Sequence, residues 1–338
     1  MQFYAGIDLH SNNSVIVVID GEGKLVYQKR LDNNLDIIQK ALEPYKSNLS
    51  GVVVESTFNW YWLVDGLMEQ QYRLHLANTT AIQQYSGIKC TNDYTDAKWL
   101  AELLRLKLLP EGYIYPKEER GLRDLLRKRS QLVQQSTQNI LSLQNIILRQ
   151  TSKKISGNKL KTLKVEEIEL YLNDKNVQLA GISNLKVIKI LQEEIYQLER
   201  IILRQAKIKP EFNFLKSVPG IGDILALTIM LEVGDIKRFD AVGNFSSYCR
   251  CVDTKKISNG KKKGENNKKN GNKFLAWAFI EAANFAVRYN EEIKKYYQKK
   301  LNKTKHVVAT KTIAHKLARA CFYIIRDGVQ FEVNKAFG

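Results

Sequence analysis

The sequence predicts a multidomain protein in which an α/β domain with a mixed sheet of the ribonuclease-H kind precedes two helical parts. Three observations support this prediction. Short runs rich in β-branched residues alternate with polar turns over the first third of the chain, and apolar residues at helical spacing dominate the remainder. The formal net charge of +18 over 338 residues is concentrated after the first third.

The first segment alternates between strand and helix patterns. Three consecutive strands joined by polar and glycine-rich turns precede alternating helices and strands, which is typical of a mixed sheet. The expected elements are strands over 3–8, 15–20 and 25–28, a helix over 35–45, a strand over 51–55, a helix over 60–70, a strand over 74–77 and a helix over 93–109.

Two long helical stretches follow a boundary at Pro116. Both have heptad-like spacing, which is typical of coiled-coil helices that serve for dimerisation. Two amphipathic helices packed within one monomer are the alternative. The repeating positions are Leu126, Val133, Ile140 and Ile147 in the first stretch, and Ile188, Leu191, Ile195, Leu198 and Ile202 in the second.

The last segment, from about Pro210, is helical and basic. Its opening turn, residues 218–222, resembles that of a helix-hairpin-helix motif, in which free amides at a helix N-terminus accept a phosphate oxygen. Residues 254–273 form a loop with eight lysines and one acid, which predicts either a solvated linker or a phosphate-contacting loop. The candidate nucleic-acid-binding residues are Gly220, Gly222, Lys255, Lys256, Lys261, Lys262, Lys263, Lys268, Lys269 and Lys273.

The distribution of charge indicates two kinds of module. Residues 1–116 contain 10 Lys and Arg against 13 Asp and Glu, whereas the remainder contains 43 against 22. This division favours a carboxylate-using module joined to one that binds a polyanion, most commonly nucleic acid.

Other classes of protein are disfavoured. No apolar run reaches the roughly 18 residues of a membrane span, and the N-terminus lacks the pattern of a signal peptide. We therefore expect a soluble, cytoplasmic protein. Four cysteines in so long a chain predict reduced thiols rather than a disulfide framework. They are Cys90, Cys249, Cys251 and Cys321.

Four carboxylates are the candidate catalytic residues. Asp8 and Glu55 end two strands, and Asp93 and Asp96 open the next long helix on one face. Mg²⁺ prefers oxygen ligands, and two ions about 3.5–4 Å apart clamp the attacking and leaving oxygens of a phosphodiester displacement. Each residue alone has a structural alternative, as a turn or helix cap. The set of four, in this order, predicts a site for two Mg²⁺ ions.

Several motifs carry a resemblance that covers essentially the whole chain. The chain resembles DEDD-class transposases of insertion-sequence family 110, within the 1111-like branch, and the pilin-gene invertases are relatives. The motifs are Gly6-Ile7-Asp8, Val54-Glu55, residues 91–98, the 218–222 turn, Ser258-Asn259-Gly260 and residues 270–275.

This resemblance implies a RuvC-like nuclease domain over 1–116, a coiled-coil oligomerisation insert over 117–208 and a transposase domain over 209–338. It implies that the four carboxylates bind the metal and that Ser258 is the nucleophile. Many members place this serine directly before the glycine, whereas here Asn259 stands between Ser258 and Gly260. Members recombine DNA as tetramers, and a noncoding bridge RNA pairs with target and donor DNA.

We therefore expect a Mg²⁺-dependent DNA transposase of a bacterial or archaeal nucleoid, which forms a phosphoserine link and needs no ATP. Consistent with this, residues 260–264 lack the spacing of a Walker-type phosphate loop. A Holliday-junction nuclease that uses water and a non-catalytic nucleic-acid-binding scaffold are the alternatives. An actin-like sugar kinase is a third, but its later glycine loops are missing from the sequence.

Overall fold

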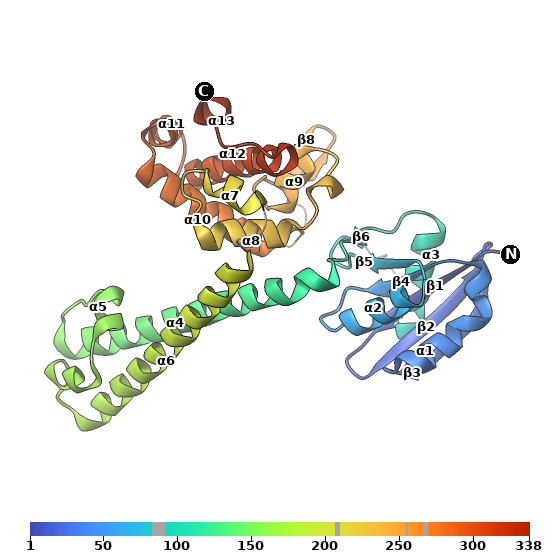
Figure 1. The fold of residues 1–338 in the computed structure, drawn as a ribbon, viewed down its shortest axis with the longest axis horizontal. Helices are drawn as coiled ribbons and strands as arrows, with labels where there is room; N and C mark the ends of the chain where they lie inside the picture. Colours follow the sequence, from blue (N-terminus) through green and yellow to red (C-terminus); the bar gives the residue numbers. More distant parts are fainter. Residues whose placement is uncertain (83–91, 207–209, 255, 266–269) are drawn as a thin grey trace. The chain divides into compact units, whose positions relative to one another are not determined.

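A computed structural model describes residues 1–82, 92–206, 210–254, 256–265 and 270–338 (Figure 1). The chain divides into two compact units, Met1–Lys117 and Glu118–Gly338, and each is considered by itself. Among the described residues, no helix combines the length and apolar character needed to cross a bilayer. Of the positions singled out above, Cys90, Lys255, Lys268 and Lys269 lie outside the described residues.

A six-stranded mixed sheet forms the first unit. Its strand order is β3-β2-β1-β4-β5-β6, with β1 antiparallel to β2 and parallel to β4. The predicted alternation of strands and helices is confirmed. The elements are β1 (Phe3–Leu9), β2 (Asn13–Asp20), β3 (Leu25–Asp32), α1 (Leu35–Leu42), a 3₁₀ helix (Glu43–Asn48), β4 (Leu49–Glu55), α2 (Tyr61–Glu69), β5 (Leu74–Ala77), α3 (Asp93–Arg105) and β6 (Glu111–Gly112).

Side chains of β1 alternate between the two faces of the sheet. Ala5, Ile7 and Leu9 pack in the core that includes α1 and α2. The intervening residues, Gly6 and Asp8, therefore point to the opposite face. The buried Ala97 and Ala101 of α3 lie on that face, in one cluster with valines of β2. Asp8 is thus on the side of the sheet that α3 covers.

Gly6 allows α3 to lie directly on β1. A Cβ at Gly6 would lie 2.0 Å from the carbonyl oxygen of Ala97 and 2.8 Å from the amide nitrogen of Ala101. Both are backbone atoms, so neither can rotate away as a flexible side chain could. The absence of a side chain at Gly6 therefore sets the distance between α3 and the strand.

A capping box fixes the start of α3. The Asn92 side chain accepts a hydrogen bond from the Thr95 amide at 3.0 Å, and Thr95 Oγ1 accepts one from the Asn92 amide at 2.8 Å. Asp93 and Asp96 lie in the first turn that follows. The helix ends at Arg105, earlier than predicted, because the backbone turns left-handed at Lys107, with φ of 57°.

The second unit is predominantly helical (Figure 1). The periodic stretches form α4 and α6, and the basic segment folds into a bundle of shorter helices. The elements are α4 (Lys117–Thr151), α5 (Gly157–Thr162), a 3₁₀ helix (Val165–Leu170), α6 (Lys175–Ala206), α7 (Pro210–Lys216), α8 (Asp223–Val233), a 3₁₀ helix (Ile236–Arg238), α9 (Val242–Tyr248), β7 (Lys256–Ser258), β8 (Lys261–Gly264), α10 (Lys273–Tyr289), α11 (Glu291–Leu301), α12 (His306–Asp327) and α13 (Val333–Phe337).

Helices α4 and α6 pack against each other in antiparallel orientation within the chain. Arg129, early in α4, donates to Glu199, late in α6, at 2.6 Å. Ile147, late in α4, shares a buried cluster with Ile188, early in α6. This is the intramolecular packing that the alternative interpretation predicts, and a coiled coil between subunits stays a prediction. Of the predicted positions, Ile140, Ile147 and Ile188 are buried in this cluster, and Leu126 and Ile202 are buried in the core that includes the shorter helices of the second unit.

The 218–222 turn contains a glycine that packing requires. Gly220 has φ of +85°, and a Cβ there would lie 2.3 Å from the Ala282 carbonyl oxygen and 2.6 Å from the Ala286 amide nitrogen of α10. A side chain at Gly220 would force α10 away from the turn. This glycine is therefore needed for packing, whether or not it also contacts nucleic acid.

We predict that Gly6→Ala destabilises the first unit by about 1–3 kcal/mol or more, because the new methyl group overlaps two backbone atoms of α3. Hydrogen exchange of the α3 amides should become correspondingly faster. Gly21→Ala is the matched control, because the nearest described atom to a Cβ there lies 3.9 Å away. Equal exchange rates in the two variants would contradict the role given to Gly6.

Candidate functional site

The parallel pairing of β1 and β4 brings two of the predicted carboxylates together. Ile7 lies opposite Val54, so the residues that follow them, Asp8 and Glu55, are neighbours at the same edge of the sheet. Their side chains share a hydrogen bond. Asp8 is only 4% exposed. The register therefore places a buried carboxylate next to a second one.

A pocket of about 340 Å³ lies beside this pair. Asp96, from the first turn of α3, joins Asp8 and Glu55 in its lining, so three of the four predicted carboxylates meet there. The remaining wall is mostly apolar. It consists of Thr79, Ile82, Trp99 and Leu100.

Burial and the neighbouring carboxylates raise the pKa of Glu55. Burial is the largest cause, and the hydrogen bond to Asp8 and the charges of Asp8 and Asp96 add to it, so that the pKa is about 8. Without a cation, the Glu55 carboxyl therefore holds a proton near neutral pH. A divalent cation would neutralise the same crowding and displace that proton.

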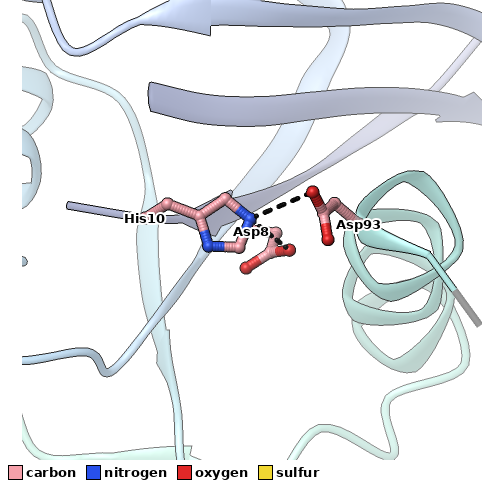
Figure 2. Close-up of side chains that lie close together, drawn as sticks. All are labelled: Asp8, His10 and Asp93. Carbon is pink, nitrogen blue, oxygen red and sulfur yellow. Dashed lines mark ion pairs between the residues drawn. The ribbon is translucent and has the colours of Figure 1, made fainter. Parts of the chain in front are cut away.

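Asp93 also lies close to Asp8, and His10 lies between these two carboxylates (Figure 2). His10 Nε2 is 3.3 Å from Asp8 Oδ2 and 3.3 Å from Asp93 Oδ2. The Arg30 guanidinium donates to Asp93, and this hydrogen bond holds the pKa of that carboxyl below its usual value. Asp93 therefore stays ionised and available as a ligand.

This group fits a metal cation. The ligand atoms of Asp8, His10 and Asp93 all lie within 4.8 Å of one another. His10 Nε2 is buried and faces one oxygen of each carboxylate. A buried nitrogen between two carboxylate oxygens is compatible with metal binding.

His10 was not predicted as a candidate ligand. The sequence suggested only that it belongs to the polar turn between two strands. The available signal was its position two residues after Asp8, since residues i and i+2 of an extended chain point to the same side.

Ser258 lies at the end of a hairpin in the second unit. Strands β7 and β8 pair with Ser258 opposite Lys261, and Asn259 and Gly260 form the two-residue connection with φ of 50° and 69°. These values are typical of a type I′ turn, for which Asn-Gly is the favoured sequence. The turn therefore accounts for the presence of an asparagine between Ser258 and Gly260. The sequence predicted an irregular loop here, without this hairpin.

Both ends of the hairpin segment are held by the helical core. Arg250 donates to the carbonyl of Gly271 at 2.9 Å. Asn272 caps α10 and donates to Glu232 at 2.7 Å, and Arg127 makes two hydrogen bonds to the same carboxylate at 2.6 and 2.8 Å. Glu232 is 1% exposed. Residues 270–275 therefore anchor the segment that carries Ser258.

The other predicted nucleic-acid-binding residues lie at or near the surface. Lys261 and Lys263 are exposed on β8, and Lys273 is exposed at the first position of α10. Gly222 is the N-cap of α8, and no described atom lies within 4 Å of a Cβ built there. Lys256 and Lys262 belong to β7 and β8. Nucleic-acid binding by these residues stays a prediction.

We predict that Glu55→Gln stabilises the metal-free protein more at pH 8 than at pH 6. Because the folded pKa of Glu55 is raised from 4.5 to about 8, its contribution to stability is fully present below pH 4.5 and is lost as the pH rises through 8. Thermal denaturation with a chelator measures the difference.

Glu102→Gln is the control for this experiment. Arg105 lowers the pKa of Glu102, so its carboxylate is ionised at both pH values and its replacement should have the same effect at each. A shift in melting temperature for Glu55→Gln that is equal at pH 6 and pH 8 would contradict the prediction.

Comparison with known proteins gives two family models that together match most of the chain. One, for DEDD transposases of the IS110 type and described as "Transposase", matches residues 5–152. The other, "Transposase IS116/IS110/IS902 family", matches residues 213–298. The curated "Insertion element IS110 uncharacterized 43.6 kDa protein" of Streptomyces coelicolor is 24% identical over 183 residues. That match covers 52% of this chain and 45% of the relative, so this chain spans about half the relative's length. The chain belongs to the IS110 family of DEDD transposases.

Proposed function

We propose that this protein is a DNA transposase that cleaves and rejoins DNA with metal-bound carboxylates and a serine nucleophile. The observation that carries the proposal is the meeting of Asp8, Glu55 and Asp96 in one pocket, with Asp93 close to Asp8. Membership of the family supports it. The strand order β3-β2-β1-β4-β5 supports a RuvC-like ribonuclease-H fold for the nuclease domain, residues 1–116.

The carboxylates would hold divalent cations, which we propose to be Mg²⁺. Bound ions of this kind polarise a scissile phosphate and stabilise the attacking and leaving oxygens. The protein's residues prepare the site in different ways. Asp8 belongs both to the pocket with Glu55 and to the group with Asp93. Arg30 keeps Asp93 ionised, and Glu55 retains a proton that it can release.

Ser258 is proposed as the nucleophile. A bond forms from Ser258 Oγ to phosphorus as the phosphorus–oxygen bond to the departing DNA strand breaks, and the serine proton is lost while the departing oxygen gains one. The phosphoserine link conserves bond energy, so rejoining needs no ATP. The exposed Lys261 and Lys263 on the same hairpin supply positive charge for the DNA phosphates.

The remaining proposals rest on the family resemblance and on charge. We propose that residues 117–208 serve oligomerisation, that residues 209–338 form the transposase domain, and that the active assembly is a tetramer guided by a noncoding bridge RNA. After residue 116 the chain has 43 basic and 22 acidic residues, and this positive charge supports binding of DNA and RNA.

A Holliday-junction-type nuclease is the second candidate. Within the described residues, the Ser258 hydroxyl has no hydrogen-bonded base, whereas the carboxylate pocket contains groups that can activate water. Water would then attack the phosphate, and Ser258 would have no chemical role.

We predict that Ser258→Ala abolishes a covalent protein–DNA adduct on a suicide substrate carrying the element's ends, with nucleic-acid affinity retained. Asp8→Asn should abolish the same adduct, because it removes a buried metal-ligand charge. The exposed Asp36→Asn is the control and should react like the parent. Cleavage by Ser258→Ala at the parental rate would favour water and the nuclease.

A second prediction concerns the turn beside the nucleophile. Asn259→Gly should keep the adduct-forming rate, because glycine adopts positive φ freely. Asn259→Val should slow the reaction about 5- to 30-fold, since asparagine tolerates the left-handed conformation whereas it costs a β-branched residue such as valine about 1–2 kcal/mol. Equal rates in the two variants would show that the turn conformation does not matter.

A further inference from the structure

His10 places a nitrogen atom between two carboxylates of the candidate metal centre. Its Nε2 is 3.3 Å from an oxygen of Asp8 and 3.3 Å from an oxygen of Asp93 (Figure 2). Ligands on opposite sides of a divalent cation with bonds of about 2.1 Å lie about 4.2 Å apart. The three ligand atoms, all within 4.8 Å of one another, can therefore surround one cation after small side-chain adjustments.

The surroundings of His10 Nε2 favour a cation at this position. The Nε2 atom is buried, and the polar atoms that it faces are one oxygen of Asp8 and one of Asp93, each at 3.3 Å. Carboxylate oxygens and an imidazole nitrogen are all ligands that a divalent cation accepts. A cation at this place would be attracted by all three groups.

The backbone holds His10 in this position independently of its side chain. Its amide donates to the Asn13 carbonyl at 2.9 Å. Its own carbonyl accepts hydrogen bonds from the side chains of Asn33 at 3.0 Å and Asn59 at 2.9 Å. Asn59 follows β4, so these contacts tie the end of β1 to the chain just beyond Glu55. The imidazole is therefore presented by a fixed turn.

We propose that His10 is a ligand of the metal centre and that its nitrogen makes this position prefer Mn²⁺ to Mg²⁺. This inference rests on the proposed function. Carboxylate and water ligands suit Mg²⁺ and Mn²⁺ alike, whereas an imidazole nitrogen favours first-row transition ions over Mg²⁺. Mn²⁺ is the most weakly bound ion of that series, and its unpaired electrons report directly on a nitrogen ligand, so it is the appropriate probe.

Electron spin-echo modulation of the full chain with Mn²⁺ alone, without nucleic acid, tests the proposal. We expect ¹⁴N modulation in the parent and its loss in both His10→Ala and His10→Gln. His306→Ala is the matched control, because His306 is an exposed histidine of the second unit, and it should keep the modulation. Calorimetric titration should show Mn²⁺ binding at least about tenfold weaker in His10→Ala, with Mg²⁺ binding changed less.

The outcomes separate this inference from the proposed function. Mn²⁺ that binds the parent but not Asp8→Asn, with no ¹⁴N modulation or with modulation that persists in both His10 variants, would overturn the role of His10 and leave the carboxylate centre in place. Mn²⁺ binding that is unchanged in Asp8→Asn would overturn the metal centre itself. Circular dichroism checks the fold, which should survive because the hydrogen bonds of His10 described above involve its backbone.

Discussion

The close approach of α3 to β1 is the constraint on which the candidate metal centre depends. It exists because Gly6 has no side chain where the backbone of α3 passes, at the level of Ala97 and Ala101. The same strand carries Asp8 two residues further on, and the first turn of α3 carries Asp93 and Asp96. A larger residue at position 6 would lift the helix and separate these carboxylates. The contact between Gly6 and the α3 backbone therefore determines both the packing of the helix on the sheet and the positions of the candidate metal ligands.

Crowded carboxylates need compensation, and the structure provides it in two forms. Arg30 lies against Asp93, and a proton is retained on Glu55. Each reduces the repulsion that like charges would otherwise produce. A divalent cation would take over this role for all of them, which is why the same residues serve both a stable fold and a metal site.

In the second unit, a buried network of hydrogen bonds anchors the segment that contains the exposed hairpin to the helical core. Glu232 is a buried carboxylate that accepts two hydrogen bonds from Arg127 of α4 and one from Asn272, the cap of α10. A buried charge is tolerated only when it is paired and hydrogen-bonded in this way. The network joins α4, α8 and α10 at the point where the hairpin segment ends, so the position of Ser258 depends on residues distant in sequence.

The sequence by itself determined the elements and the order of the carboxylates, because strand alternation, heptad spacing and helix caps are local properties of neighbouring residues. It also contained the Asn-Gly signal of the hairpin turn, but strands of three and four residues that are rich in lysine resemble a loop. Only the tertiary structure decided that Asp8 and Glu55 are neighbours, since this follows from the register of β1 on β4. It also decided that His10 faces Asp93, and that the α4 and α6 stripes meet within one chain. Such pairings join residues far apart in sequence, and packing between elements selects them where local spacing cannot.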